Sequence, residues 1–181
     1  MHAREKAIGE NLTRLGGPGL HTRLGINTGV MAVGNMGCSQ KFNYSVLGDP
    51  VNLASRLEGQ NKAYNTSILI SQSTAAVVGK HFRLRKIDCI RVKGKLQPIS
   101  VYELMSDDLN DANLAELAAE YEAALASYQK QKWDESEMRI VGILKKFPED
   151  GPCKTLIKRI AAYRHDPPPP DWDGVFTAKE K

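Results

Sequence analysis

The composition of the chain changes near residue 106, and this change limits what the chain can fold into. Before that point, short runs of β-branched residues alternate with glycines, a pattern typical of short strands and tight turns. After it, the sequence is rich in Ala, Leu and Glu, with apolar residues at helical spacing. We therefore expect an α+β part followed by a small helical part within the 181 residues.

Hydrophobic periodicity predicts the elements of both parts. We expect strands near 22–28, 30–35, 41–47, 67–71, 82–93 (as a hairpin) and 99–105. We expect helices near 50–62, 72–79, 114–130, 134–147 and 151–164. The resulting units are a remnant helix and linker, the α+β part, the helical part and a Pro-rich tail, at 1–19, 20–106, 107–165 and 166–181.

The helical part has two interpretations. Leu117, Tyr121 and Leu125 keep helical spacing, which a plain bundle explains. A tetratricopeptide-like hairpin is the alternative, and such a unit must bury its face on the first part or on another chain. The tail "DPPPPDWDGV" is a stiff spacer that either folds back to dock Trp172 or hangs loose.

Bulk composition narrows the setting. The net charge of +4, from 25 basic and 21 acidic residues, does not by itself indicate a nucleic-acid or membrane partner. The 3 cysteines are an odd number without metal-type spacing, and we expect reduced thiols in the cytoplasm. Because the N-terminus is polar and charged, we expect no signal peptide there, and no apolar run approaches the ~18 residues of a membrane helix.

The stretch "YSVLGDPVNLASRLE", residues 44–58, reads as a strand, a tight turn and a helix. Asp49 is a good cap, and Pro50 fits the first helical position. Asn52 and Arg56 lie one turn apart and project from the same side. With the free N–H groups of the helix start, they suit a phosphate ester. On spacing alone, a plain exposed helix face explains the pair equally well.

Two other stretches, residues 24–37 and 80–95, give weaker indications of function. "LGINTGVMAVGNMG", residues 24–37, predicts a glycine-bearing hairpin and lacks the spacing of a dinucleotide or P-loop motif. Residues 80–95 hold seven cations against the single acid Asp88. A solvated sheet edge explains such a run most simply, and a triphosphate-binding Lys93 or a nucleic-acid patch is the alternative. Aromatic residues are sparse there, so we expect no nucleic-acid partner.

Together these motifs resemble a known family. "GINTG", "VGNMG" and "YSVLGDPVNLASRLE" occur in the order found in the second half of the class III nucleotide cyclase catalytic domain, and "RVKGKLQPISVYEL" resembles its last two strands. The resemblance covers about 20–105 and implies an α+β, ferredoxin-like cyclase fold without its N-terminal strands. It is nearest to bacterial sensor-type adenylate cyclases, in which a membrane-anchored sensor precedes the catalytic domain and a helical extension follows it.

The resemblance also implies roles for four residues in converting ATP to cAMP and pyrophosphate. Asn52 would orient the ribose, and Arg56 would stabilise the charge that develops on the α-phosphate. Lys93 would contact the leaving polyphosphate. Ser45 stands at the base-selecting position, where adenylate cyclases usually carry Asp or Thr, and its hydroxyl still favours adenine. Asn43, where an acid is common, is a minor departure.

One departure is larger. The family binds two divalent metal ions, Mg or Mn, through two aspartates that precede the "GINTG" segment. The lysine that reads adenine also precedes this segment. We find no match for these three residues in this chain. Asp49 and Glu58 match no metal position.

The resemblance also implies a partner. Class III sites form between two protomers, so we expect a homodimer, or pairing with a complete cyclase protomer, and no turnover by this chain alone. The alternative is a non-catalytic regulatory module derived from a cyclase. Membrane attachment would come only through an upstream region.

Overall fold

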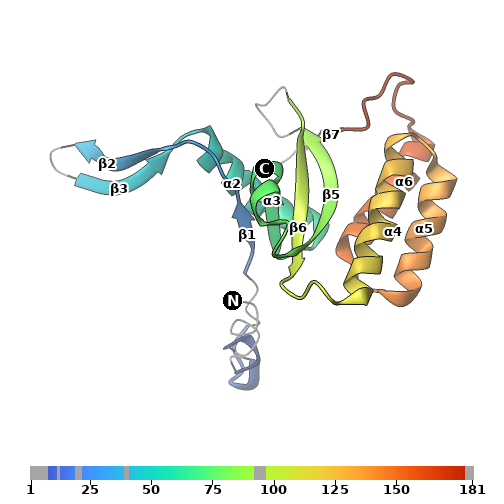
Figure 1. The fold of residues 1–181 in the computed structure, drawn as a ribbon, viewed down its shortest axis with the longest axis horizontal. Helices are drawn as coiled ribbons and strands as arrows, with labels where there is room; N and C mark the ends of the chain where they lie inside the picture. The colour runs from blue at the N-terminus through green and yellow to red at the C-terminus, as the bar shows by residue number, and fades with distance from the viewer. Residues whose placement is uncertain (1–7, 12, 19–21, 39–40, 92–96, 178–181) are drawn as a thin grey trace.

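The computed structural model describes residues 8–11, 13–18, 22–38, 41–91 and 97–177. Its centre is a 5-stranded sheet with the order β1-β4-β6-β5-β7 (Figure 1). The strands are β1 Leu24–Ile26, β4 Ile68–Ser71, β6 Ile99–Ser106, β5 Arg83–Arg91 and β7 Phe176–Thr177. β1 and β4 are parallel, β6 is antiparallel to both β4 and β5, and β7 is parallel to β5. The α+β expectation is confirmed.

A second, 2-stranded sheet forms the β2–β3 hairpin, which consists of Ala32–Cys38 and Lys41–Leu47. The hairpin projects away from the central sheet as an arm, on the left in Figure 1. We call it the hairpin arm. β3 has the expected bounds of 41–47, because its alternating apolar residues carry the period of a strand. β2 begins two residues and ends three residues later than the expected 30–35.

Two helices complete the α+β part: α2, Asp49–Tyr64, and α3, Gln72–Val78. Pro50 occupies the first turn of α2, where its missing N–H leaves no bond unmade. The expectation that Asp49 caps α2 is wrong by one position. Gly48 stands at the cap without a side-chain hydrogen bond, and Asp49 is already helical. α3 has a side-chain cap, because Ser71 accepts a bond from the Thr74 N–H.

The helical unit consists of α4 Ala112–Gln129, α5 Trp133–Lys146 and α6 Gly151–His165. Asp111 caps α4 by accepting from the N–H groups of Asn113 and Leu114. Asp150 caps α6 by accepting from Cys153 N–H. The three expected helices therefore form within two residues of their predicted bounds. That they are tetratricopeptide-like stays a prediction.

One expectation about the sheet is wrong. The described part of the expected hairpin at 82–93 contains no turn, because β5 is one strand that pairs with β6 through an irregularity between Lys86 and Asp88. Two polar residues of β5, Arg85 and Asp88, pair with Asp150 and Arg159 of the helical unit. Lys93 lies outside the described residues.

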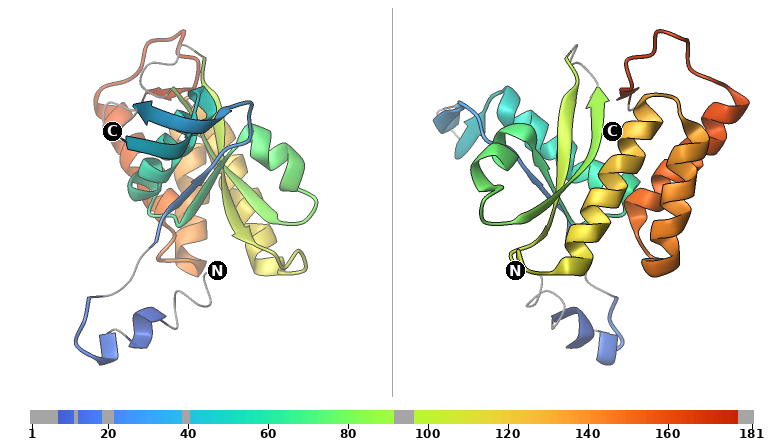
Figure 2. Two further views of the ribbon diagram at one scale, coloured as in Figure 1. Left: turned by 90° about the vertical axis from the view of Figure 1, so that its left-hand side faces the viewer. Right: turned by 45° about the vertical axis from the view of Figure 1, so that its right-hand side comes forward.

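The helical unit packs against the sheet and shares one core with it. Ile87 and Ile90 of β5, Leu57 of α2, and Tyr121 and Leu125 of α4 belong to one continuous buried cluster. The views in Figure 2 agree that α4 lies beside the sheet. The tail returns to the molecule, since β7 pairs with β5 and Trp172 packs on Tyr128, Trp133 and Tyr163. Of the two expectations for the tail, docking is confirmed.

Candidate active site

The first two turns of α2 carry the residues for which the sequence predicts chemistry. Asn52 is exposed and Arg56 is half-buried, one turn apart on the same helix. Within the described part of the chain, neither side chain makes a hydrogen bond or an ion pair. An amide and a guanidinium with unused donors at a helix start are suited to bind an anion from outside the chain.

The segment between β1 and the hairpin arm fixes where α2 starts. The amide of Asn27 donates to the carbonyl of Pro50 at 3.0 Å. Its oxygen accepts from the Ser73 hydroxyl, also at 3.0 Å, so one side chain links α2 to the start of α3. The hydroxyls of Thr28 and Thr74 lie 3.0 Å apart and add a second link. The "GINTG" residues therefore act as a brace for the α2 start.

Close packing of β1 on α2 explains a glycine in this motif. A Cβ on Gly25 would lie 2.1 Å from the carbonyl oxygen of Ala54 and 2.2 Å from the nitrogen of Glu58. No side chain fits there without moving the helix. Further along α2, the buried amide of Asn61 donates to the Leu24 carbonyl at 2.9 Å and accepts from the Thr66 hydroxyl at 2.9 Å. Sequence reasoning missed Asn61, because a polar residue in a helix gives no local sign of a buried role.

The remaining predicted site residues lie apart from this pair. Ser45 is half-buried on β3, opposite Gly34, on the strand that leads into α2. Asp49 and Glu58 are both exposed on α2. The described residues contain no group of three or more His, Cys, Asp or Glu side chains that could hold a metal ion. The pair of divalent ions that the resemblance implies therefore does not fit the residues described here.

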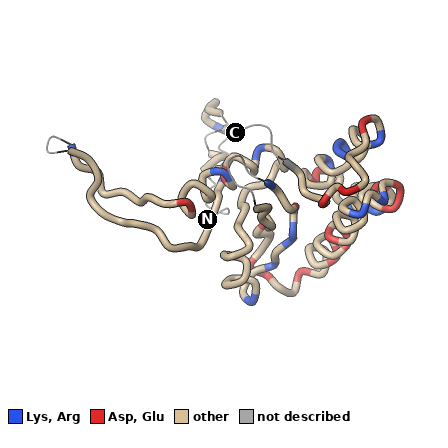
Figure 3. Tube along the Cα trace, turned by 90° about the horizontal axis from the view of Figure 1, so that it is seen from above, with Lys and Arg blue, Asp and Glu red and all other residues tan. Residues whose placement is uncertain are grey.

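The hairpin arm presents apolar side chains to solvent. Cross-strand pairing puts Val33 opposite Val46, and Tyr44 and Phe42 follow on the same face. Phe42 is 64% exposed and Tyr44 is 78% exposed. Lys41 is the single charged residue between positions 32 and 47 of the sequence, and Figure 3 shows the arm almost uncoloured by charge. An uncharged, apolar strand surface of this kind is typical of an interaction site.

Comparison with known proteins gives the family. The family model described as "Adenylate and Guanylate cyclase catalytic domain" matches residues 5–106, which is more than half of the 181 residues. This chain belongs to that family. The resemblance expected from the motifs is thereby confirmed.

Individual relatives agree. Adenylate cyclase 1 of Rhizobium meliloti (strain 1021) is 39% identical over 88 residues, 49% of this chain and 13% of the relative. The terminal-differentiation specific adenylate cyclase of Dictyostelium discoideum is 30% identical over 145 residues, 77% of this chain and 7% of the relative. The crystal structure of the adenylyl cyclase CyaB from P. aeruginosa matches with a TM-score of 0.52 at 31% identity, covering 60% of this chain and 55% of that one. The chain thus spans a small part of the two curated relatives and about half of the solved structure.

A buried ionic network joins the cyclase sheet to the helical unit, and sequence reasoning missed it. Asp88 of β5 is fully buried and accepts from the Tyr64 hydroxyl at 2.6 Å. It also pairs with Arg159 of α6, whose guanidinium donates to the Tyr64 oxygen at 3.1 Å. The available signal was Asp88 itself, the one acid in the basic run at 80–95.

The electrostatics of this network favour one charge state. Burial, and then the neighbouring Asp88 charge, hold the pKa of Tyr64 well above its ordinary value, so the phenol stays a donor. Burial alone lowers the pKa of Arg159, but Tyr64 and Asp88 outweigh it and raise the pKa above its ordinary value. In this network, Tyr64 therefore stays a neutral donor and Arg159 stays a cation.

A second buried cation, Arg85, lies on β5 three positions before Asp88. Arg85 donates to Glu103 of β6 at 3.0 Å and to Asp150, the cap of α6, at 2.8 Å. Its guanidinium also lies 4.9 Å from the ring centre of Tyr121 on α4. Burial works against this charge, yet Glu103 and Asp150 raise the pKa of Arg85 above its ordinary value. Arg85 and Arg159 thus both link the sheet to the helical unit.

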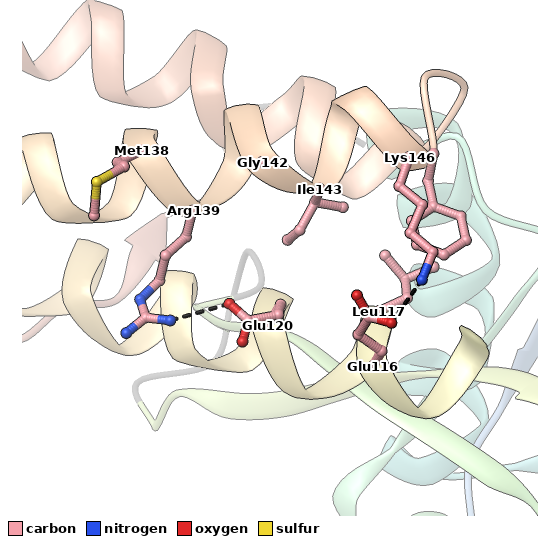
Figure 4. A pocket seen from close by; sticks show the side chains of 9 residues that line it. Glu116, Leu117, Glu120, Met138, Arg139, Gly142, Ile143 and Lys146 are labelled. Carbon is pink, nitrogen blue, oxygen red and sulfur yellow. Dashed lines mark hydrogen bonds and ion pairs between the residues drawn. The ribbon is translucent and has the colours of Figure 1, made fainter. Parts of the chain in front are cut away.

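A groove of about 350 Å³ lies between α4 and α5, away from the α2 start (Figure 4). Two ion pairs cross it, Glu120 with Arg139 at 3.0 Å and Glu116 with Lys146 at 2.6 Å. The groove is a feature of the helical hairpin and shares no residue with the candidate site. Among the described helices, none is long and apolar enough to cross a membrane.

Proposed function

We propose that this chain supplies the Asn and Arg face of an adenylate cyclase site, which converts ATP to cAMP and pyrophosphate. The observation that carries the proposal is the pair formed by Asn52 and Arg56. Both project from a braced helix start, and neither has a partner among the described residues. Membership of the cyclase family and the names of the adenylate cyclase relatives support ATP as the substrate.

The reaction needs positioning and charge stabilisation. The ribose 3′-oxygen forms a bond to the α-phosphorus, the bond from that phosphorus to the bridging oxygen breaks, and pyrophosphate leaves while the 3′-hydroxyl proton passes to solvent. The Asn52 amide would hold the ribose so that this oxygen points at the phosphorus. The Arg56 guanidinium would stabilise the charge that grows on the phosphoryl oxygens, a contribution typically worth 10²–10³ in rate, or about 2.7–4 kcal/mol.

Two further residues complete this half of the site. The Ser45 hydroxyl can accept from the adenine amino group or donate to a ring nitrogen, which favours adenine over guanine. Lys93 would contact the departing polyphosphate as a point charge. The divalent metal ions expected of the family would be held by another protomer, so nothing in this chain's share of the reaction rests on them. The apolar hairpin arm supports pairing with a second protomer.

The test uses this chain in two settings. Production of cAMP and cGMP is measured with Mn²⁺ and either ATP or GTP, first for the chain alone and then for its mixture with a cyclase fragment carrying the two metal-binding aspartates. We expect no product from the chain alone and cAMP from the mixture. Equal formation of cGMP from GTP would contradict the adenine preference.

A second candidate function is a regulatory module that binds a complete cyclase. The absence of a metal-holding cluster from the described residues, and a helical unit firmly packed on the sheet, favour it. It predicts that adding the chain changes the rate of an intact cyclase, and that the Asn52→Ala variant changes that rate by the same amount as the unmodified chain. The two functions are therefore separated by whether Asn52 matters.

A further inference from the structure

The helical unit touches the helix that carries Asn52 and Arg56 at the end opposite those residues. The Thr155 hydroxyl of α6 donates to the carbonyl of Ala63 at 2.9 Å, in the last turn of α2. A Cβ on Gly151, the first residue of α6, would lie 2.2 Å from the carbonyl oxygen of Tyr64. The start of α6 therefore abuts the end of α2 at backbone contact.

The ionic network strengthens this contact. Tyr64 is the last residue of α2, and its hydroxyl lies between the Asp88 carboxylate of β5 and the Arg159 guanidinium of α6. The same guanidinium stacks 3.5 Å from the ring centre of Phe176 in β7. Tyr64 of α2 is thus tied to the sheet through Asp88 and to the helical unit through Arg159, and Arg159 in turn contacts the returning tail.

We propose that the helical unit sets the position of α2 in the active site, with Tyr64, Asp88 and Arg159 as positioning residues. The inference rests on the function proposed for Asn52 and Arg56. Tyr64 lies twelve positions after Asn52, which is about 18 Å along a straight helix. A helix transmits a shift or rotation of one end to the other, and errors of about 1 Å in a catalytic group cost up to about 10²-fold in rate.

The start of α2 does not fix its position alone. The Asn27 bond to the Pro50 carbonyl holds one point near the first turn. Gly25 against Ala54 and Glu58 keeps the distance between β1 and the helix. Near the far end, the Asn61 bond to the Leu24 carbonyl ties α2 to β1, and the bond of Tyr64 to Asp88 adds the tie to β5 and, through Arg159, to the helical unit. Loss of the second tie would let the end of α2 shift or turn, which would move Arg56 away from its target.

The experiment compares two tyrosines that differ in what their hydroxyls tie down. Tyr64 and Tyr121 are both 1% exposed. The Tyr121 hydroxyl donates to the Ile87 carbonyl at 2.9 Å, so it links α4 to β5 and leaves α2 alone. Amide hydrogen exchange is measured on the whole chain carrying Tyr64→Phe or Tyr121→Phe. Both variants are then assayed in the mixed cyclase described above.

We expect Tyr64→Phe to speed exchange of the α2 amides by about fivefold, the factor expected for one lost hydrogen bond. In the mixture it should lower kcat about tenfold or more and change KM for ATP little, because the positioning of Arg56 acts in the transition state. Tyr121→Phe should speed exchange in α4 and β5 and leave both α2 and kcat as they were. Equal effects of the two variants on α2, or none from Tyr64→Phe, would overturn the proposal.

A second pair of variants separates positioning from general loosening. Arg159→Gln should speed exchange in α2 and lower kcat, and Arg159→Lys should restore part of both, because it keeps a cation beside Asp88. Ile140→Val loosens α5 without touching the network, since Ile140 is fully buried within the helical unit. Faster α2 exchange in Ile140→Val, matching Arg159→Gln, would contradict the proposal. The hydrogen-exchange measurements do not depend on turnover. They therefore test the positioning proposal even if the mixed cyclase makes no cAMP.

Discussion

The two ends of α2 differ in every respect that matters for function. At its start, Asn52 and Arg56 hold donors that no described residue uses. At its end, Tyr64 is 1% exposed and both donates and accepts a hydrogen bond. Unused polar groups on a fixed helix are suited to an external ligand, whereas a closed buried network is suited to holding that helix. The comparison assigns the start of α2 to chemistry and its end to support.

The same contrast separates the hairpin arm from the helical unit. Both are rich in apolar side chains, but those of the helical unit are buried in the common core while Phe42 and Tyr44 of the arm stand in solvent. Charged residues are frequent along the helices and almost absent from the arm (Figure 3). The arm therefore has the surface of an interface, and the helical unit has the surface of a packed, solvated module.

We expect the largest change in stability at the end of α2, where the buried network of Tyr64, Asp88 and Arg159 lies. Asp88→Ala leaves the Arg159 cation and the Tyr64 hydroxyl buried without their acceptor, so the free energy of unfolding should fall by about 3–5 kcal/mol. Urea denaturation measures it. Asp107→Ala, at an exposed acid in the loop before α4, is the control and should stay within about 0.5 kcal/mol. A loss below about 1 kcal/mol for Asp88→Ala would mean that the network does not hold the two parts together.

At the start of α2, which carries Arg56, we expect a small change in stability and a large change in kcat. Arg56→Ala should change the free energy of unfolding by less than about 1 kcal/mol, because no described partner is lost. In the mixed cyclase it should lower kcat about 10²–10³-fold. Lys62→Ala removes a cation from the exposed side of the same helix and should preserve kcat. Large destabilisation by Arg56→Ala would place Arg56 among the supporting residues instead.

The hairpin arm gives the next effect. Replacing Phe42 and Tyr44 together with Ser should weaken association between protomers by about 2 kcal/mol or more, because aromatic anchors dominate such interfaces. Sedimentation velocity over a concentration series measures it, and unfolding by urea should be unchanged. Val77→Ser alters another exposed apolar residue, on α3, and serves as the control. If Val77→Ser weakened association between protomers equally, the hairpin arm would not be the interface.

A smaller effect is expected where the tail docks. Trp172 lies 5.3–6.2 Å, ring centre to ring centre, from Tyr128, Trp133 and Tyr163. Trp172→Ala should therefore cost about 1–2 kcal/mol of the free energy of unfolding and should speed amide exchange in β7. His165→Ala, at the exposed last residue of α6, should do neither. An unchanged exchange rate in β7 would mean that strand pairing alone holds the tail.

The smallest effect depends on pH. The hydrogen bond from Arg91, followed by that from the Val175 N–H, lowers the pKa of Asp173 below its ordinary value. A lowered pKa stabilises the fold above the unfolded-state value near 3.8, and this contribution disappears as the pH falls through the folded-state pKa.

Asp173→Asn tests this sign directly. It should cost less than about 1 kcal/mol at neutral pH, as exposed ion pairs do, and nothing once the pH is below the folded-state pKa. Urea denaturation at pH 7 and at acid pH measures the difference between the variant and the unmodified chain. A difference that grows towards acid pH would show the opposite linkage.

Local patterns were sufficient to predict most of the elements. The period of apolar residues predicted β3 at 41–47 and the three helices of the helical unit, because each depends on contacts that repeat within the element. The spacing of Asn52 and Arg56 predicted that both share one face of α2. The expected hairpin at 82–93 was wrong, because β5 is one strand paired with β6 along its length.

The support of the site could not be predicted in this way. Tyr64 reaches Asp88 across 24 residues of sequence, Arg159 reaches Asp88 across 71 and Tyr64 across 95. No local period reports such contacts, since they exist only once the helical unit has packed on the sheet. Asp88 was visible as an acid among cations, but its partners were not.

The most direct test is complementation of a disabled cyclase. A complete class III adenylate cyclase protomer, with the Asn and Arg of its own V-N-x-A-x-R motif replaced by Ala, is titrated with this chain and cAMP is measured. We predict that cAMP rises about a hundredfold with added chain, that Lys62→Ala supports the same rise, and that Asn52→Ala and Arg56→Ala abolish it. A rise that survives in both of those variants, or no rise from a folded chain that binds the partner, would contradict the assignment of Asn52 and Arg56 to the active site.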